Sequence, residues 1–301
     1  MNPKVSIIIR TYNRADLIER AIQSALEQSF QDFEIIVADD GSTDHTKELV
    51  EQLTLKDHRI RFVTQDHSGR PGRTLNLGLQ NSRGRYIAML DSDDEWLPSK
   101  LEKQIKLLES SAPNIGLVFC HTIAINQDGA PEKRPVSHAA NFLEAILLKG
   151  YLFPSSMLAK KEVFEIIGPI DENFLIMDDW DMFIRMAQEY QYNFVSEPLY
   201  KYYIHHTNIS FSKNYAKHAT DLEYLLNKHS ALYKSHPKIL EHHYITLASY
   251  LINADEMKKA KFYLKKSFQL NRSLKNLLRL ALSYFGKIVY QKYRTSRGRL
   301  A

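Results

Sequence analysis

The sequence predicts an α/β fold with a mixed, mainly parallel sheet, followed by an all-helical C-terminal extension. Three observations predict it. Short apolar segments alternate with amphipathic segments of helical periodicity through the first half of the chain. The apolar segments are continuous, as is typical of parallel strands that are buried on both faces. From Tyr215 onward the chain shows helical patterning alone.

The elements follow one another in a regular order. Five buried strands are predicted at residues 5–9, 33–38, 59–64, 86–90 and 116–125. Helices are predicted at 15–28, from the capping residues 42–44 to about 53, at 74–80, and from Pro98 to about 109. Two short helices follow at 139–148 and 177–189. Residues 126–138 hold two prolines and a glycine, which predicts a loop.

The chain has 301 residues, enough for one large domain and a smaller appendage. We place the α/β domain at 1–212, with halves 1–125 and 126–212, and a basic helical region at 213–301. Residues 213–301 hold 18 Lys and Arg against 5 Asp and Glu, whereas the remainder holds 22 against 30. An acidic domain and a basic tail need separate explanations.

Cysteine content and hydropathy indicate the cellular compartment. The single cysteine, Cys120, cannot form an internal disulfide or a zinc site, so buried packing is expected. The N-terminus shows no secretory signal pattern, and no apolar run is long enough to span a bilayer. We therefore expect a cytoplasmic protein.

Polar clusters follow three of the predicted strands, at residues 10–14, 39–42 and 91–94. In sheets of this kind, ligands bind beyond the carboxyl ends of the strands. Asp91, Asp93 and Asp94 put three carboxylates within four residues, which is costly unless a cation is present. Carboxylates suit Mg²⁺ or Mn²⁺, which in turn suit phosphates. Capping of the helix near Pro98 is the alternative, but it explains only one carboxylate.

These clusters resemble the motifs of inverting family-2 glycosyltransferases, which have a nucleotide-sugar-binding, Rossmann-like fold of the GT-A type. The resemblance covers about residues 4–210. It rests on an opening strand at 6–14, a second motif at 38–44 and the metal motif at 90–94. Arg10 stands where a proline is commoner in the family. The three motifs in this order are highly specific.

The resemblance implies a donor site and a metal site. Thr11, Tyr12 and Asp40 would hold the nucleobase, by stacking and by accepting the imide hydrogen of uracil, which favours a UDP-sugar. The donor site would also include Asn13 and Arg14, and Asp91 with Ser92 near the ribose. Asp93 would bind the Mg²⁺ or Mn²⁺ that bridges the diphosphate and stabilises the leaving nucleotide.

A loop at 69–73 precedes Asn76-Leu77-Gly78, which fits the family's Asn-x-Gly helix. Leu75 stands where the family often has arginine, and Arg73 would supply the missing charge to the donor. The alternative for Arg70 and Arg73 is a solvated loop.

The second half resembles the acceptor side of the family. Asp178-Asp179-Trp180-Asp181 matches its Glu-Asp-Trp-Asp motif, with Asp178 replacing glutamate. By this match Asp179 is the base that deprotonates the acceptor hydroxyl. Its neighbours Asp178, Trp180 and Asp181 would bind the acceptor. The alternative is that these carboxylates favour a helix N-terminus.

Residues 203–210 resemble the closing family segment, in which a histidine often follows an aromatic-arginine pair. Tyr203 takes the usual arginine place, and His205 would approach the metal or the diphosphate. The alternative for His205 is a hydrogen bond within a loop.

The basic tail combines Lys and Arg with Leu, Phe, Tyr and Ile. Such helices can rest on anionic lipid, which would make the protein peripheral at the inner face of the membrane. Packing on neighbouring helices with a solvated basic face is the alternative. Nucleic acid is not an expected partner, because no recognition motif accompanies the charge.

The expected function is inverting, metal-dependent transfer of a sugar from a nucleotide-sugar to a glycan or lipid-linked acceptor in cell-surface polysaccharide synthesis. One rival is a nucleotidyltransferase, but residues 10–13 lack the glycine-rich phosphate loop expected there. The other rival is a non-catalytic binding module that uses the helical tail; loss of Asp93 or Asp179 would have favoured it.

Overall fold

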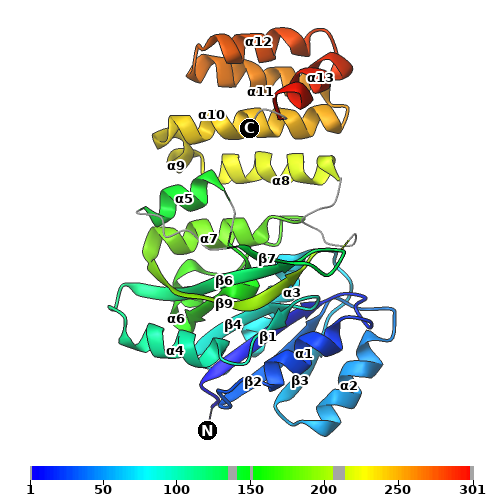
Figure 1. Cartoon of the computed structure of the whole chain (residues 1–301), viewed down its shortest axis with the longest axis vertical. Helices are drawn as coiled ribbons and strands as arrows, with labels where there is room; N and C mark the ends of the chain where they lie inside the picture. Colours follow the sequence, from blue (N-terminus) through cyan, green and yellow to red (C-terminus); the bar gives the residue numbers. More distant parts are fainter. Residues whose placement is uncertain (1, 135–140, 150–151, 206–213, 299–301) are drawn as a thin grey trace. The chain divides into compact units, whose positions relative to one another are not determined.

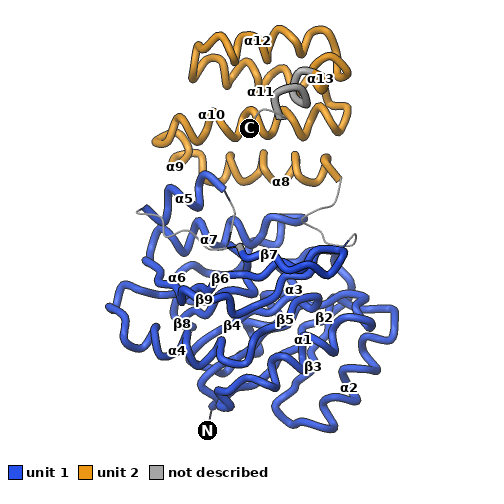
Figure 2. The backbone as a smooth tube through the Cα atoms, viewed as in Figure 1, with its two compact units in different colours: residues 1–208 blue, residues 209–301 orange. Residues whose placement is uncertain are grey.

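The computed structural model describes residues 2–134, 141–149, 152–205 and 214–298. The chain divides into two compact units, residues 1–208 and 209–301 (Figure 2). The sequence placed this division at residue 212, within the segment 206–213 that lies outside the described residues.

The described residues of unit 1 build one nine-stranded mixed sheet (Figure 1). Its order is β3-β2-β1-β4-β8-β6-β9-β5, and β7 pairs with β6 outside this path. The strands are β1 (Val5–Thr11), β2 (Phe33–Asp39), β3 (Ile60–Thr64), β4 (Tyr86–Asp91), β5 (Glu95–Trp96), β6 (Ile115–Ile125), β7 (Pro131–Arg134), β8 (Leu158–Lys160) and β9 (Gln191–Tyr203).

The strand register brings the polar clusters to one edge of the sheet. β1 pairs in parallel with both β2 and β4, so that Arg10 lies opposite Asp91 and Thr11 lies opposite Asp39. Residues that follow these strands therefore meet beyond the same carboxyl ends. On the far side of β4 the sheet turns antiparallel through β8, and β6 then pairs in parallel with β9.

Helices cover both faces of the sheet. Those of unit 1 are α1 (Ile18–Leu26), α2 (Thr46–Lys56), α3 (Pro71–Asn81), α4 (Lys100–Ser110), α5 (Phe142–Leu148), α6 (Lys161–Ile167) and α7 (Asp178–Glu189), with a 3₁₀ turn, η1, at Pro154–Ser156. Alternate residues of β1, among them Ile7 and Ile9, share a core with α1, α2 and α4. Ile8 points to the other face, where Gly78 of α3 lies so close that an added Cβ would overlap the Ile8 side chain.

The predicted loop at 126–138 is wrong in part, because it contains β7. Asn126 donates its N–H to Ala130 O at 3.0 Å, and Gly129 has φ +81°, which closes a hairpin between β6 and β7. Pro131 is tolerated because it begins an edge strand. Strands β5, β8 and β9 were not predicted. Cys120 is buried, as expected.

The described part of unit 2 is entirely helical, which confirms the predicted extension. Its helices are α8 (Tyr215–Lys228), α9 (Ser230–Ser235), α10 (Pro237–Asn253), α11 (Met257–Leu270), α12 (Leu274–Ser283) and α13 (Lys287–Gly298). Within the described ranges of the whole chain, no helix combines the length and apolar character needed to cross a bilayer.

Candidate active site

An acidic turn follows β4 at the carboxyl edge of the sheet. Asp94 donates its backbone N–H to Asp91 O at 3.0 Å, which folds the three carboxylates back on one another around the buried Ser92. Burial raises the pKa of Asp94 well above its usual range, and the charges of Asp91 and Asp93 raise it further. Among the described residues, Asp94 Oδ2 has no hydrogen-bond partner. The turn is therefore a place where a cation would be stabilising.

Asp93 is surrounded by nitrogen donors from three separate segments. Its Oδ2 lies 3.1 Å from His205 Nε2 and 3.9 Å from Arg14 Nη2. Its backbone oxygen accepts a hydrogen bond from Arg20 Nη2 at 2.5 Å, and the Arg20 guanidinium also stacks 3.7 Å from the centre of the Tyr203 ring. The structure thus brings together Asp93, His205 and Arg14, which sequence reasoning had linked. It adds Arg20 of α1, which sequence reasoning missed.

The donor set at Asp93 suits a divalent cation that is shared with a substrate. No group of three or more His, Cys, Asp or Glu side chains placed to hold a metal occurs within the described ranges. Mg²⁺ is usually held by one or two carboxylates together with substrate phosphates and water. Asp93 and His205 fit such a site, in which a diphosphate would complete the coordination.

Arg10 joins the acidic turn to the first turn of α7. Its Nε donates to Asp91 Oδ1 at 3.2 Å, and its Nη1 donates to Asp178 Oδ2 at 2.9 Å. Burial lowers the pKa of Arg10, but the carboxylates of Asp178, Asp91 and Asp179 outweigh this and raise it above its ordinary value. Arg10, which stands where the family commonly has proline, therefore links the acidic turn to the first turn of α7.

Asp179 is partly buried beside this ion pair. Burial and the charge of the neighbouring Asp178 together raise the pKa of Asp179 to about 7, although the positive charge of Arg10 opposes them. Its Oδ1 accepts the backbone N–H of Trp180 at 2.7 Å. A carboxyl group that titrates near neutral pH is suited to act as a general base.

The other three residues of this motif have structural partners. Asp178 is 2% exposed and is paired with Arg10. Trp180 donates its indole N–H to Ile146 O at 2.7 Å, which anchors it to α5. The expectation that Asp181 binds the acceptor needs correction. Its side chain is 0% exposed and is paired at 2.9 Å with Arg185 Nε, so it stabilises α7 from the interior.

Asp40 directly follows β2, and its carboxylate is surrounded by the loop that follows β3. Its carboxylate accepts hydrogen bonds from Gln65 Nε2 and Ser68 Oγ, each at 2.8 Å, and from Gly69 N at 2.9 Å, and it lies 2.9 Å from His67 Nδ1. Burial raises the pKa of Asp40, but the hydrogen bonds from Gln65, Ser68 and Gly69 outweigh this and hold it below its usual value. The structure thus gives Asp40 a role in shaping this loop.

Tyr12 presents the one large exposed ring of the β1 segment. Its side chain is 39% exposed and stacks on His67 with ring centres 4.0 Å apart. Thr11 Oγ1 is buried and, among the described residues, has no hydrogen-bond partner. Asn13 has φ 51°, and its side chain accepts the N–H of Thr43 at 2.8 Å. Asn13 therefore ties the two loops together, Tyr12 keeps part of its ring exposed, and the Thr11 hydroxyl is buried next to it.

The Asn-x-Gly segment links α3 to the approach of α7. Asn76 Oδ1 accepts the N–H of Ile170 at 2.8 Å, and its Nδ2 donates to Ile170 O at 2.9 Å and to Glu172 Oε1 at 2.8 Å. Arg73 is exposed on the first turn of α3, and its side chain has no hydrogen bond or ion pair with any described residue. The structure does not bring Arg73 to the acidic turn.

Ser155 of η1 is a buried partner of the acidic turn that sequence reasoning missed. Its hydroxyl accepts the backbone N–H of Asp91 at 3.0 Å and donates to Asp91 Oδ2 at 3.2 Å. Its backbone oxygen accepts the indole N–H of Trp96 at 2.8 Å. No sequence signal marks Ser155, because its partners lie about 60 residues away in the chain.

Comparison with known sequences identifies relatives of one enzyme class. The model of the family Glycosyl transferase family 2 matches residues 6–181. An uncharacterized glycosyltransferase of Methanocaldococcus jannaschii is 31% identical over 208 residues, which cover 67% of this chain and 71% of that protein. The Campylobacter jejuni GalNAc(5)-diNAcBac-PP-undecaprenol beta-1,3-glucosyltransferase is 44% identical over 100 residues. These cover 33% of this chain and 32% of that protein.

Solved structures share the whole architecture at low identity. Staphylococcus aureus TarS 1–349 in complex with UDP-GlcNAc aligns with a TM-score of 0.66 and 17% identity, over 97% of this chain and 92% of that one. The mannosyltransferase PcManGT of Pyrobaculum calidifontis, in complex with GDP-Man and Mn²⁺, aligns at 0.60 and 18% identity, over 97% and 86%. The predicted GT-A type fold with C-terminal helices is confirmed.

Proposed function

The chain belongs to glycosyl transferase family 2, and from this premise we propose that it transfers a sugar, with inversion, from a UDP-sugar to a glycan or lipid-linked acceptor in cell-surface polysaccharide synthesis. One observation carries the proposal. Arg10 joins Asp91 of the acidic turn to Asp178, whose neighbour Asp179 has a pKa of about 7. The acidic turn, which suits a metal-bound diphosphate, and Asp179, which suits base catalysis, are thus connected through Arg10.

The donor would bind across the carboxyl ends of β1, β2 and β4. Tyr12 offers a ring face to the base, and Thr11 would offer a hydroxyl that is buried and has no hydrogen-bond partner among the described residues. Asp40 acts by fixing the loop that carries His67; contact with a uracil imide would require it to exchange one of its present hydrogen bonds. Arg14 contributes positive charge beside Asp93.

Asp93 and His205 would hold a Mg²⁺ or Mn²⁺ ion, which supplies stabilisation of negative charge on the departing diphosphate. The chain's own residues preorganise this place. Ser155 fixes the Asp91 carboxylate, and Arg20 fixes the Asp93 backbone. A solved relative that binds Mn²⁺ is consistent with this proposal.

Transfer would proceed by attack of an acceptor hydroxyl on the anomeric carbon. The new carbon–oxygen bond forms as the bond to the UDP oxygen breaks, and the hydroxyl proton passes to Asp179. Attack opposite to the leaving nucleotide inverts the anomeric centre. The rival nucleotidyltransferase lacks support because no glycine occurs at residues 10–13. A non-catalytic module would not need a carboxyl group with the raised pKa of Asp179.

The names of relatives support the acceptor class. The Campylobacter jejuni relative acts, by its name, on an undecaprenol-linked glycan. This name supports the lipid-linked acceptor that we propose for this chain.

Substitution of Asp179 by Asn tests the proposal directly. We expect transfer to fall by about 10²–10⁴-fold, the usual contribution of a general base, with donor affinity nearly unchanged. Asp128→Asn, on the exposed turn before β7, is the matched control and should transfer normally. Equal losses of donor binding and transfer in Asp179→Asn would show that the base assignment is wrong.

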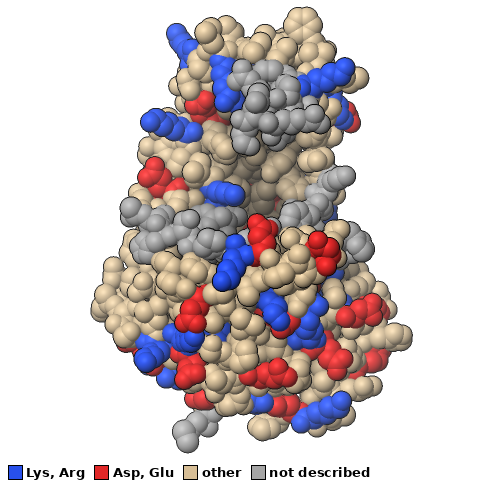
Figure 3. Space-filling model, viewed as in Figure 1, with Lys and Arg blue, Asp and Glu red and all other residues tan. Residues whose placement is uncertain are grey.

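The C-terminal helices support a further part of the proposal, contact with anionic lipid at the inner face of the membrane. Helices α12 and α13 and the turn between them expose large apolar side chains: Leu274, Leu277, Leu278, Phe285 and Ile288, of which Leu274 is 85% and Phe285 is 73% exposed. Unit 2 carries 18 Lys and Arg against 5 Asp and Glu, and side chains of both kinds lie on its visible face in Figure 3. Apolar side chains amid positive charge are complementary to an anionic lipid surface.

Vesicle flotation tests the lipid contact. We expect the full chain to float with anionic vesicles and not with neutral ones, and Leu274→Ser with Phe285→Ser to abolish flotation. Leu55→Ser is the matched control, because Leu55 is 88% exposed on α2 of unit 1. If the double variant floats as well as the unaltered chain, or if the unaltered chain does not float with anionic vesicles, the lipid contact is wrong.

A further inference from the structure

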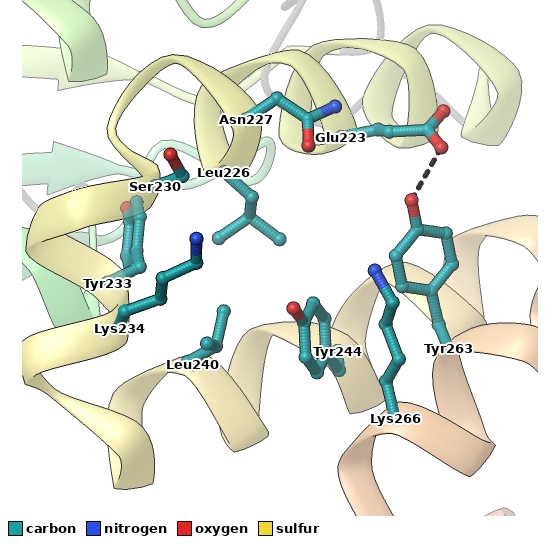
Figure 4. A pocket seen from close by; sticks show the side chains of 10 residues that line it. All are labelled: Glu223, Leu226, Asn227, Ser230, Tyr233, Lys234, Leu240, Tyr244, Tyr263 and Lys266. Carbon is teal, nitrogen blue, oxygen red and sulfur yellow. Dashed lines mark hydrogen bonds between the residues drawn. The ribbon is translucent and has the colours of Figure 1, made fainter. Parts of the chain in front are cut away.

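A polar cavity of about 310 Å³ lies inside unit 2, between the helices α8, α9, α10 and α11 (Figure 4). Its walls carry side chains from both sides that point inward, including Lys234, Lys266, Asn227 and Tyr244. The volume matches the lower end of the range for small-molecule sites. None of its lining residues belongs to the candidate active site.

Two ammonium groups enter the cavity from opposite walls. Lys234 of α9 is exposed and, among the described residues, its side chain has no ion pair or hydrogen bond. Lys266 of α11 lies among three rings, with its Nζ 4.6 Å from the centre of Phe262, which is outside the lining, 5.5 Å from that of Tyr244 and 5.6 Å from that of Tyr263. Its charge is therefore not compensated by a carboxylate within the described residues. The cavity thus holds two positive charges that are available to an anion.

The one acidic residue in the lining is already engaged. Glu223 Oε1 accepts a hydrogen bond from Tyr263 OH at 2.5 Å, and Glu223 Oε2 lies 3.8 Å from Lys259 Nζ. Lys259 also lies 3.4 Å from Glu256 Oε2, so Glu223 keeps part of its charge; one carboxylate against two lysines still leaves the lining net positive. The Glu223 carboxylate can still accept a hydrogen bond at the wall of the cavity.

The other lining groups suit a sugar ring. Tyr244 is half-buried, and its ring centre lies 5.6 Å from that of Tyr263, which gives an aromatic wall. The side chains of Asn227 and Ser230 form no hydrogen bonds with other described residues, so an amide and a hydroxyl are available. Aromatic faces with short polar side chains bind the apolar faces and hydroxyls of carbohydrates.

We propose that this cavity binds an acidic sugar unit, one that carries a carboxylate or a phosphate group. Lys234 and Lys266 would bind the anionic group, and Tyr244 would contact the ring. The identification of that unit as part of the acceptor glycan rests on the proposed function; the binding itself does not. The acceptor would then be an acidic polymer that the helical unit holds.

Calorimetric titration of the full chain tests the proposal, with UDP and Mg²⁺ present so that the donor site is saturated. The probes are glucuronic acid, glucose 6-phosphate, glucose and inorganic phosphate. We expect one or both acidic sugars to bind at least about tenfold more tightly than glucose, the ratio that one charge-assisted hydrogen bond supplies. Whichever acidic sugar binds more tightly identifies the anionic group.

Variants locate the binding. Lys234→Gln and Lys266→Gln should each weaken binding by about fivefold to tenfold. The matched control Lys265→Gln should not, because Lys265 is exposed on the same helix as Lys266 but does not line the cavity. Equal binding of glucose and the acidic sugars, inorganic phosphate binding as tightly as glucose 6-phosphate, or equal losses in Lys265→Gln would overturn the proposal. Donor turnover, measured separately, reports on the proposed function alone.

Discussion

The ion pair between Arg10 and Asp178 should be the strongest single link between the acidic turn and α7. Asp178 is 2% exposed, and Arg10 Nη1 lies 2.9 Å from its Oδ2. Removal of one partner leaves the other buried without compensation, which costs about 3–5 kcal/mol. Arg10→Met should therefore lower the melting temperature of unit 1 by about 6–20 °C, at 2–4 °C per kcal/mol for a unit of this size.

A double-mutant cycle isolates the pair from the second bond that Arg10 makes to Asp91. We expect Arg10→Met and Asp178→Ala to couple by about 2 kcal/mol or more, because the double variant no longer buries an unpaired charge. Both tryptophans, Trp96 and Trp180, lie in unit 1, so fluorescence during urea denaturation reports on that unit.

The matched control is the exposed pair Lys47 and Glu51 on α2, whose side chains are each 54% exposed. Their coupling should stay below about 0.5 kcal/mol. A coupling between Arg10 and Asp178 no larger than this would refute the reasoning, since it would mean that the buried bridge contributes no more than a surface pair.

Three other predictions concern the reaction and the packing beneath it. Because Asp179 must be charged to act as a base, and burial raises its pKa to about 7, kcat/KM should rise with pH and level off above about 7; a rate that is flat between pH 5.5 and 8.5 would contradict this. Ser155→Ala should reduce turnover by about tenfold, because Asp91 loses two hydrogen bonds, whereas the neighbouring Ser156→Ala, whose hydroxyl donates to Phe153 O, should not; equal kinetics for the two variants would argue against a positioning role. Gly78→Ala should cost about 1–3 kcal/mol in urea unfolding, since its Cβ would overlap Ile8, and an unchanged midpoint would show that α3 can move aside.

The first half of the fold follows from the sequence because its elements are long and locally patterned. Continuous apolar runs such as Val5 to Ile9 predict strands that are buried on both faces, and the structure places all five residues of that run in the core or against it. Strands β5 and β8 have two and three residues, too few for any periodicity to emerge. Strand β9 mixes exposed and buried positions irregularly, because its register with β6 shifts.

Residues of the candidate site were predictable from the sequence where they belong to a short motif of the family. Asp93 and His205 meet as the family resemblance implied, although they are 112 residues apart. Ser155 and Arg20 were not found, because their contribution depends on tertiary contacts with the acidic turn. Asp181 shows the opposite failure: its place in the family motif suggested that it binds the acceptor, yet it is buried and paired with Arg185 one helical turn later.

The central claim is that the acidic turn serves a UDP-sugar through a divalent metal. The most direct measurement is the release of UDP from a panel of UDP-sugars after chelation and after Mn²⁺ is restored, in the unaltered chain and in Asp93→Asn. We expect release from at least one UDP-sugar, its loss on chelation, its recovery with Mn²⁺, and a fall of about 10–100-fold in Asp93→Asn. Release that persists without metal, or the absence of release from every UDP-sugar, would contradict the account.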